Sequence, residues 1–264
     1  MAEDLVRTDP DDEAPEPETS AGATESPYQS RFQLIFGVLL GVSLAAVVAT
    51  VLVLTSGSTN EDQGAVTWAP WQPNAGDGQQ AVNQIAEHVG QRYTLPSGNQ
   101  LVGVRGGPLE LARLPVTIAL EQQGNVKILD EKGVLYNLCG LGVNCSIKEG
   151  KATVARSLVL RREALELALY TFRYIKNVDQ VVVILPPRKG QKPSYAMFFR
   201  RSDVGASLDR PLAATLPGSP PVPPKLSQNQ QDFINRLTAA NLFAYTPQEG
   251  GDAHIYLVLS RPTG

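Results

Sequence analysis

An uncharged apolar stretch near the N-terminus constrains this chain more than any other feature. Leu34 to Leu54 reads LIFGVLLGVSLAAVVATVLVL and has no charged residue in its 21 positions. As a helix it would measure about 32 Å, which matches a hydrocarbon core of about 30 Å. A helix in a soluble core normally carries a polar stripe, and this stretch has none. The sequence therefore predicts one membrane-spanning helix over residues 32–55.

A cleaved signal peptide is the alternative interpretation of this stretch. Signal peptides have an apolar region of about 7–15 residues behind a short basic segment. Here the stretch is longer and follows an acidic leader, although the small residues Ser56, Gly57 and Ser58 come directly after it. We expect the uncleaved anchor, because the stretch has the length of a complete span.

The charge of the chain is divided between its two ends. Residues 1–31 contain nine acidic and two basic residues, a net charge of −7, and the rest of the chain carries +4. With four prolines and little to bury, this segment is expected to be a disordered tail. Arg31 precedes the apolar stretch, and no lysine or arginine follows it before Arg92. The positive-inside rule therefore places the tail in the cytoplasm and the remainder outside the cell membrane.

Small residues recur at every fourth position of the apolar stretch. Gly37, Gly41, Ala45 and Ala49 would share one face of a helix, because residues four apart lie above one another. Such a smooth face lets two helices approach closely. We therefore expect contact with the lipid bilayer and, through this face, with a second copy of the chain. The alternative is that small residues are merely common in membrane helices.

A polar segment rich in Ser, Gly, Asn, Gln and Pro follows at residues 56–78 and is expected to be a linker. Trp68 and Trp71 lie within it. They either enter the membrane interface as aromatic anchors or clamp the linker onto its own domain, and we expect the clamp. The domain itself is expected over residues 79–264, with a proline-rich crossing at 217–225.

Alternating helical and strand patterns predict an α+β domain. Helices are expected from Asp77 to Val89, within Thr153–Ile175 and over Gln228–Ala240. Strands are expected at Tyr93–Leu95, Gln100–Val104, Val116–Leu120, Val126–Leu129, Val134–Cys139, Gln180–Leu185, Tyr195–Arg200 and His254–Leu259. A break is expected at Arg105–Pro108, where two glycines precede a proline. From Val134 the order is β-α-β-β-α-β, as in ferredoxin-like sheets. We therefore expect a mainly antiparallel sheet packed by helices.

The reactive residues form no catalytic or metal-binding pattern. His88 and His254 are the only histidines, and neither has a second ligand at metal spacing. No serine lies in a G-x-S-x-G elbow, and the acids are scattered. Nucleic-acid binding would require a concentrated basic face with stacking aromatics, which the sequence lacks. We expect no catalytic site, no metal, no cofactor and no nucleic acid.

The two cysteines predict a disulfide. Cys139 and Cys145 are the only cysteines, and a compartment outside the membrane favours a bridge. Gly140 and Gly142 between them allow the chain to curl, which brings the sulfur atoms together. Two buried thiols are the alternative.

A basic loop is the second specific feature of the domain. Arg188, Lys189 and Lys192 are flanked by prolines and lie between the expected strands Gln180–Leu185 and Tyr195–Arg200. They are expected at an exposed hairpin tip, as a candidate site for anionic lipid or an anionic wall polymer. The alternative is a solvated turn whose charges only aid solubility.

These features favour a membrane-anchored, non-catalytic protein of the cell envelope, whose outer domain binds or assembles with an envelope partner. This layout carries no function by itself, so two alternatives stay open. One is a transmembrane sensor that signals through the acidic tail. The other is an extracytoplasmic enzyme, whose signature would be a deep cleft with clustered carboxylates of shifted pKa.

Overall fold

The structure, a computed structural model, describes residues 67–74, 78–122, 124–251 and 254–262. The acidic tail, the predicted membrane helix at 32–55 with its Gly37–Ala49 face, and residues 56–66 of the linker lie outside these residues. In the part of the chain that is described, no helix combines the length and the apolar character needed to cross a bilayer.

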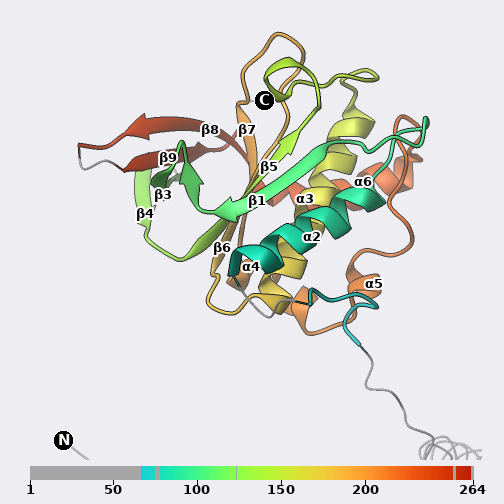
Figure 1. The fold of residues 1–264 in the computed structure, drawn as a ribbon, viewed down its shortest axis with the longest axis horizontal. Helices are drawn as coiled ribbons and strands as arrows, with labels where there is room; N and C mark the ends of the chain where they lie inside the picture. The colour runs from blue at the N-terminus through green and yellow to red at the C-terminus, as the bar shows by residue number, and fades with distance from the viewer. Residues whose placement is uncertain (1–66, 75–77, 123, 252–253, 263–264) are drawn as a thin grey trace, which may run out of the picture. The chain divides into compact units, whose positions relative to one another are not determined.

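The described chain folds into helices and strands that alternate along the sequence (Figure 1). In chain order they are α2 (Gly78–Arg92), β1 (Gly103–Pro108), β2 (Glu110–Leu111), β3 (Leu114–Gln122), β4 (Asn125–Leu129), β5 (Gly133–Cys139), α3 (Val154–Tyr174), β6 (Gln180–Ile184), β7 (Tyr195–Arg200), α4 (Arg201–Leu208), α5 (Leu212–Thr215), α6 (Gln228–Thr238), β8 (Leu242–Glu249) and β9 (Ile255–Ser260). The expected α+β class is confirmed.

A single sheet joins the strands in the order β1-β5-β6-β7-β8-β9-β3-β2, with β4 paired to β3. The pairs β5–β6 and β3–β9 are parallel, and the other pairs are antiparallel. β1 and β2 stand at opposite ends of this order, yet only Leu109 separates them in the chain. The sheet is therefore rolled until its two ends approach each other.

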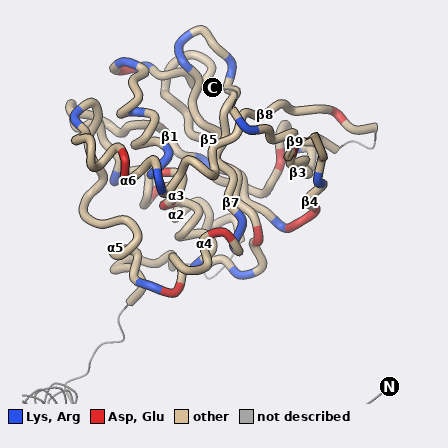
Figure 2. Tube along the Cα trace, turned by 180° about the vertical axis from the view of Figure 1, so that it is seen from behind, with Lys and Arg blue, Asp and Glu red and all other residues tan. Residues whose placement is uncertain are grey.

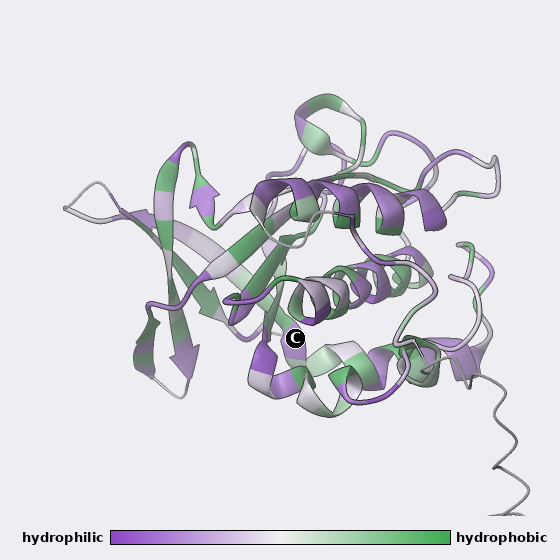
Figure 3. Ribbon diagram, turned by 60° about the horizontal axis from the view of Figure 1, so that its bottom comes forward, coloured by the Kyte–Doolittle hydropathy of each residue, from purple (hydrophilic) through white to green (hydrophobic). Residues whose placement is uncertain are grey.

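Rolling the sheet creates two hydrophobic cores. The smaller core, which includes Ile118, Phe198 and Leu257, lies between β6, β7 and the strands β3, β8 and β9. The larger core lies between the sheet and the helices and includes Ile85 and Leu169. The helices gather to one side of the rolled strands (Figure 3).

Helix α3 is the central element of the larger core. Every residue from Leu158 to Phe172 is buried, because α2, α4, α6 and the sheet all pack against this helix. The Thr153 side chain caps its start by accepting a hydrogen bond from the Arg156 backbone N–H at 3.2 Å. The charged residues of α3 are thus buried together with its apolar stripe. Arg173, near the C-terminal end of the helix, is the exception and is exposed.

The ferredoxin-like arrangement is wrong in two respects. The order from Val134 is β5-α3-β6-β7-α4-α5-α6-β8-β9, so the chain forms three helices and the additional strand β8 before the final strand. In addition, β5 and β6 are directly paired, whereas a split β-α-β unit has another strand between them. β8 carries few buried side chains, so its hydrophobic pattern is weak, and its pairing with β7 and β9 holds it in the sheet.

The prediction of a break at Arg105–Pro108 is also wrong, because these residues belong to β1. Gly106 pairs with Tyr136, and a Cβ atom there would lie only 2.5 Å from the side chains of Tyr136 and Val82. The missing side chain lets α2 pack closely onto β1. Two further strands were expected, at Tyr93–Leu95 and Gln100–Val104. Instead, Thr94 and Gln100 form an isolated β-bridge, and β1 begins at Gly103.

The described end of the linker packs onto the C-terminal end of α3. Trp68 is 6% exposed, and its ring makes edge contacts with Tyr170 and Tyr174 at centroid distances of 5.3 and 5.8 Å. Trp71 stacks on His88 at 3.9 Å. These contacts are those of the clamp that the sequence predicts, and they fix where the chain enters the domain.

Candidate anion-binding groove

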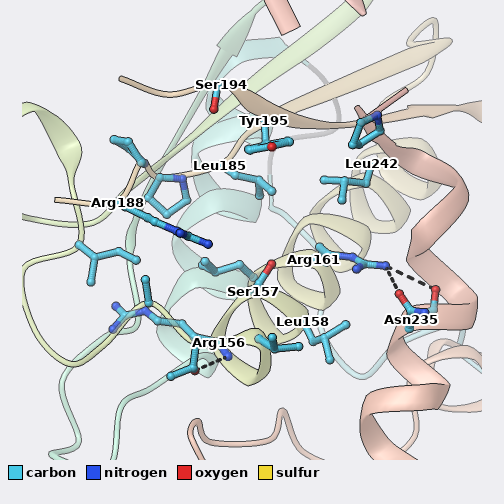
Figure 4. Close-up of a pocket in the computed structure, with 18 of the residues that line it drawn as sticks. Arg156, Ser157, Leu158, Arg161, Leu185, Arg188, Ser194, Tyr195, Asn235 and Leu242 are labelled. Atoms are coloured by element: carbon cyan, nitrogen blue, oxygen red, sulfur yellow. Dashed lines mark hydrogen bonds between the residues drawn. The ribbon is translucent and has the colours of Figure 1, made fainter. Parts of the chain in front are cut away.

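A groove of about 910 Å³ opens where three segments meet at the N-terminal end of α3 (Figure 4). The first turns of α3 form its floor, the loop between β6 and β7 forms one wall, and α6 forms the other. Its apolar lining includes Leu158, Leu185 and Leu242, and the hydroxyls of Ser157, Ser194 and Tyr195 add hydrogen-bonding groups. The groove is therefore apolar at its base and polar at its rim.

The charges around the groove are mostly positive. Arg156, Arg161, Arg188 and Lys192 line it, against one acidic residue, Asp232. Within the described residues, none of the four cations forms an ion pair with a carboxylate. The groove therefore has an excess of positive charge that its own side chains do not neutralise.

The basic loop is an exposed connection between the antiparallel strands β6 and β7, as the sequence predicts. A backbone hydrogen bond of 3.0 Å from Gln191 to Arg188 closes its turn. Only basic charges mark this loop in Figure 2. Arg188 reaches across the groove toward Ser157 (Figure 4). Arg188 and Lys192 line the groove, whereas Lys189 does not.

The two arginines contributed by α3 are held by neutral partners. Arg161 donates to the Thr238 hydroxyl at 2.9 Å and to the Asn235 side-chain oxygen at 2.8 Å, which fixes it against α6. Arg156 donates to the backbone carbonyls of Leu101 and Glu149. Burial lowers the pKa of both guanidinium groups, but arginine still remains charged. Their partners orient the charges without cancelling them.

A disulfide joins Cys139 and Cys145, and the prediction of this bridge is confirmed. Two residues after the bridged Cys145, the backbone N–H of Ile147 donates to the Pro187 carbonyl at 3.2 Å. Ile147 and Pro187 both line the groove. Gly140 is required here, because a Cβ atom would lie 2.3 Å from the Ser146 carbonyl oxygen. The segment that follows the bridge is thus hydrogen-bonded to the loop that forms one wall of the groove.

The carboxylates of α3 lie in the core and not in the groove. Glu166 is paired with Arg92 and lies 3.7 Å from Arg162, and it accepts a hydrogen bond from the Tyr93 hydroxyl at 2.7 Å. Glu163 is fully buried, and its carboxyl oxygens have no hydrogen-bond partner in the described part of the protein. Burial, and secondarily the charge of Glu166, raise the pKa of Glu163 well above its usual range.

The sequence anticipates part of this site. The basic loop is recognisable from its charges and flanking prolines, but Arg156 and Arg161 occur within a helical pattern that gives no hint of a groove. Their contribution depends on how α6 and the β6–β7 loop pack beside α3. Among the described residues, no cluster of His, Cys, Asp and Glu is suited to hold a metal ion.

Comparison with protein-family models, with curated proteins and with solved structures finds no significant match to this chain.

Proposed function

We propose that this protein is a membrane-anchored binding protein of the cell envelope, and that its outer domain holds an anionic partner in the groove at the N-terminal end of α3. The anchor in this proposal is the apolar stretch Leu34–Leu54. The proposed binding site is the groove, around which Arg and Lys residues outnumber acidic residues.

The residue types around the groove support binding rather than catalysis. Arginine presents a planar fork of donors that suits phosphate and carboxylate oxygens. The hydroxyls of Ser157, Ser194 and Tyr195 can donate to the same oxygens. Proton transfer at neutral pH is usually performed by His or by a carboxyl of shifted pKa. The carboxyl with the raised pKa, Glu163, lies in the core, away from the groove.

The main support for the proposal is that, within the described residues, the groove cations form no ion pairs with carboxylates. Each cation near an anionic surface contributes about 1 kcal/mol, and salt screens this contribution. Arg188 and Lys192 are exposed and without ion pairs in the described structure, so an anionic ligand would meet them without displacing a carboxylate.

Retention on an immobilised phosphate matrix tests the proposed function. The full chain in neutral detergent is loaded on phosphocellulose at low salt and eluted with a salt gradient. The variant Arg188→Gln/Lys192→Gln should elute at lower salt than the wild type. The control Lys127→Gln/Lys176→Gln removes two exposed cations far from the groove and should elute between the two. Equal elution of both double variants would refute a role for the groove.

The location of the domain has its own test. Protease added to intact cells, or to spheroplasts where an outer membrane is present, should digest the domain that follows Leu54. A domain that is protected until the cells are lysed would reverse the orientation inferred from Arg31.

A further inference from the structure

We propose that the groove binds a small organic anion with an apolar body, such as an alkyl phosphate or alkyl carboxylate, taken up as a free molecule. This inference rests on the proposed function, because it assigns the ligand class of the same groove. Three features of the described residues support it: the apolar side chains exposed at the groove, the position of the cations, and the volume of the groove.

Exposed apolar side chains gather at the groove and in the loop beside it. Val154 and Tyr195 line the groove, although they are 72% and 46% exposed. Leu141 and Val143 are exposed in the bridged loop, which reaches the groove lining through the β-bridge from Leu141 to Ile147. These four are the majority of the seven large apolar side chains that are exposed in the described part of the chain. Apolar surface concentrated in one region is typical of a binding site, so we expect the ligand to cover it with apolar atoms.

The floor of the groove is apolar as well. Leu158 lines it from α3, Leu185 from the residue that follows β6, and Leu242 from the first residue of β8. Figure 4 shows Leu185 between Arg188 on one side and Leu242 on the other. A ligand body lying along these leucines would be removed from water. Each methylene group that is fully buried in this way raises the affinity about fourfold.

The cations lie on two sides of the groove only. Arg156 and Arg161 come from α3, and Arg188 and Lys192 come from the loop between β6 and β7. The wall formed by α6 contributes amide side chains and the acid Asp232, but no cation. A ligand with its anionic group at the loop and its apolar body over the leucines therefore matches this uneven distribution of charge.

The volume of the groove suits a single small molecule. About 910 Å³ lies within the roughly 300–1,000 Å³ of sites that hold small organic ligands. An inorganic phosphate ion would leave the apolar floor exposed to water. A lipid within a bilayer would do the same, because its chains stay in the hydrocarbon core and only its headgroup is offered. A free organic anion covers both the charged and the apolar parts of the groove.

Calorimetric titration of the full chain with a series of alkyl phosphates tests this inference. The protein is held in nanodiscs of neutral phosphatidylcholine at low salt, and empty nanodiscs give the blank for partition into the bilayer. Methyl, butyl and hexyl phosphate share one anionic group and differ in their apolar body. Affinity should rise about thirtyfold or more from methyl to hexyl phosphate, which corresponds to partial burial of the added methylene groups. Hexanol, which has the body without the anion, should bind far more weakly than hexyl phosphate.

Variants assign the two parts of the ligand to the groove. Arg188→Gln/Lys192→Gln should weaken hexyl phosphate binding roughly tenfold or more, because two groove cations are lost. Val154→Ser removes an exposed apolar side chain from the lining and should weaken hexyl phosphate about fivefold, with methyl phosphate unchanged. The matched control Val126→Ser removes an exposed valine of β4, outside the lining, and should change neither affinity. An unchanged melting temperature in each variant ensures that the comparison concerns binding.

The outcomes separate this inference from the proposed function. Equal affinities for methyl and hexyl phosphate, both weakened by Arg188→Gln/Lys192→Gln, would overturn the apolar body and leave an anion-binding groove. Displacement of hexyl phosphate by vesicles that contain phosphatidylglycerol, and not by vesicles of phosphatidylcholine alone, would overturn the free ligand in favour of a bilayer lipid. Hexanol binding as tightly as hexyl phosphate would overturn both proposals. Binding of no probe would overturn this inference, and elution from phosphocellulose would then decide the proposed function separately.

Discussion

The buried carboxyl of Glu163 gives the domain a specific dependence on pH. Glu163 is enclosed in α3, its oxygens have no hydrogen-bond partner within the described structure, and burial raises its pKa well above the usual range. In the unfolded chain the same group has a pKa of about 4.3. The folded protein therefore favours the protonated carboxyl, and the unfolded chain favours the ionised one at neutral pH.

The direction of the effect follows from this difference. Below the unfolded pKa the carboxyl is protonated in both states, and its contribution to stability is fully present. As pH rises toward the folded pKa, the unfolded state loses the proton first, so the free energy of unfolding falls by about 1.4 kcal/mol per pH unit. Glu163→Gln replaces the neutral carboxyl with a neutral amide of the same shape. The variant should equal the wild type near pH 4 and become increasingly more stable above it.

Urea unfolding from pH 4 to pH 8 measures this difference. Trp68 and Trp71 are the only tryptophans and pack onto the domain, so their fluorescence reports its unfolding. The matched control is Glu166→Gln, which removes the carboxylate that pairs with Arg92 and the buried Arg162. It should lose about 3–5 kcal/mol, because a buried charge is left without its partner. Wild-type and Glu163→Gln curves that stay parallel across this pH range would refute the reasoning.

The disulfide, the close approach at Gly106 and the small-residue face of the apolar stretch each lead to a measurable expectation. Replacing Cys139 and Cys145 by Ser should lower the free energy of unfolding by about 2.4 kcal/mol, since the bridge closes a short loop; equal urea midpoints for the variant and the wild type would contradict this. Gly106→Ala should cost about 1–3 kcal/mol by overpacking, whereas Gly205→Ala, where a Cβ meets open space, should not destabilise. Gly41→Ile should abolish crosslinked dimer in membranes, and an unchanged dimer yield would mean that the four-residue spacing is incidental.

Sequence patterns anticipate the elements whose signal is local. The helix expected at Gln228–Ala240 forms as α6, over Gln228–Thr238, because Ser227 and Gln230 make a capping box and the apolar residues recur at helical spacing. The strand expected at Gln180–Leu185 forms as β6, since its run of valines is suited to a strand buried on both faces. Cys139 and Cys145 lie too close in the chain, with glycines between them, for their pairing to depend on the rest of the fold.

Local sequence patterns do not predict the elements that form only through tertiary contacts. Gly106 and Gly107 are locally typical of a break, but both belong to β1, and at Gly106 the side chains of Val82 in α2 and of Tyr136 occupy the space that a Cβ atom would fill. β8 contains Pro247 and exposed residues, so its strand conformation depends on its neighbours β7 and β9. The rolling of the sheet, which brings β1 and β2 together at Leu109, follows from strand pairing over long distances in the chain.

The same distinction holds for the groove: the sequence predicts some of its residues, and the tertiary structure alone brings in the others. The sequence by itself identifies Arg188 and Lys192 as exposed cations, because prolines and strand patterns on both sides define a hairpin loop. It does not distinguish them from Lys189, since the three share one loop and differ only in which of them lines the groove. Arg161 joins the site because α6 packs beside α3 and offers Thr238 and Asn235 as partners. A charge in a loop is a local property of the sequence, whereas a groove exists only where segments distant in the chain pack together.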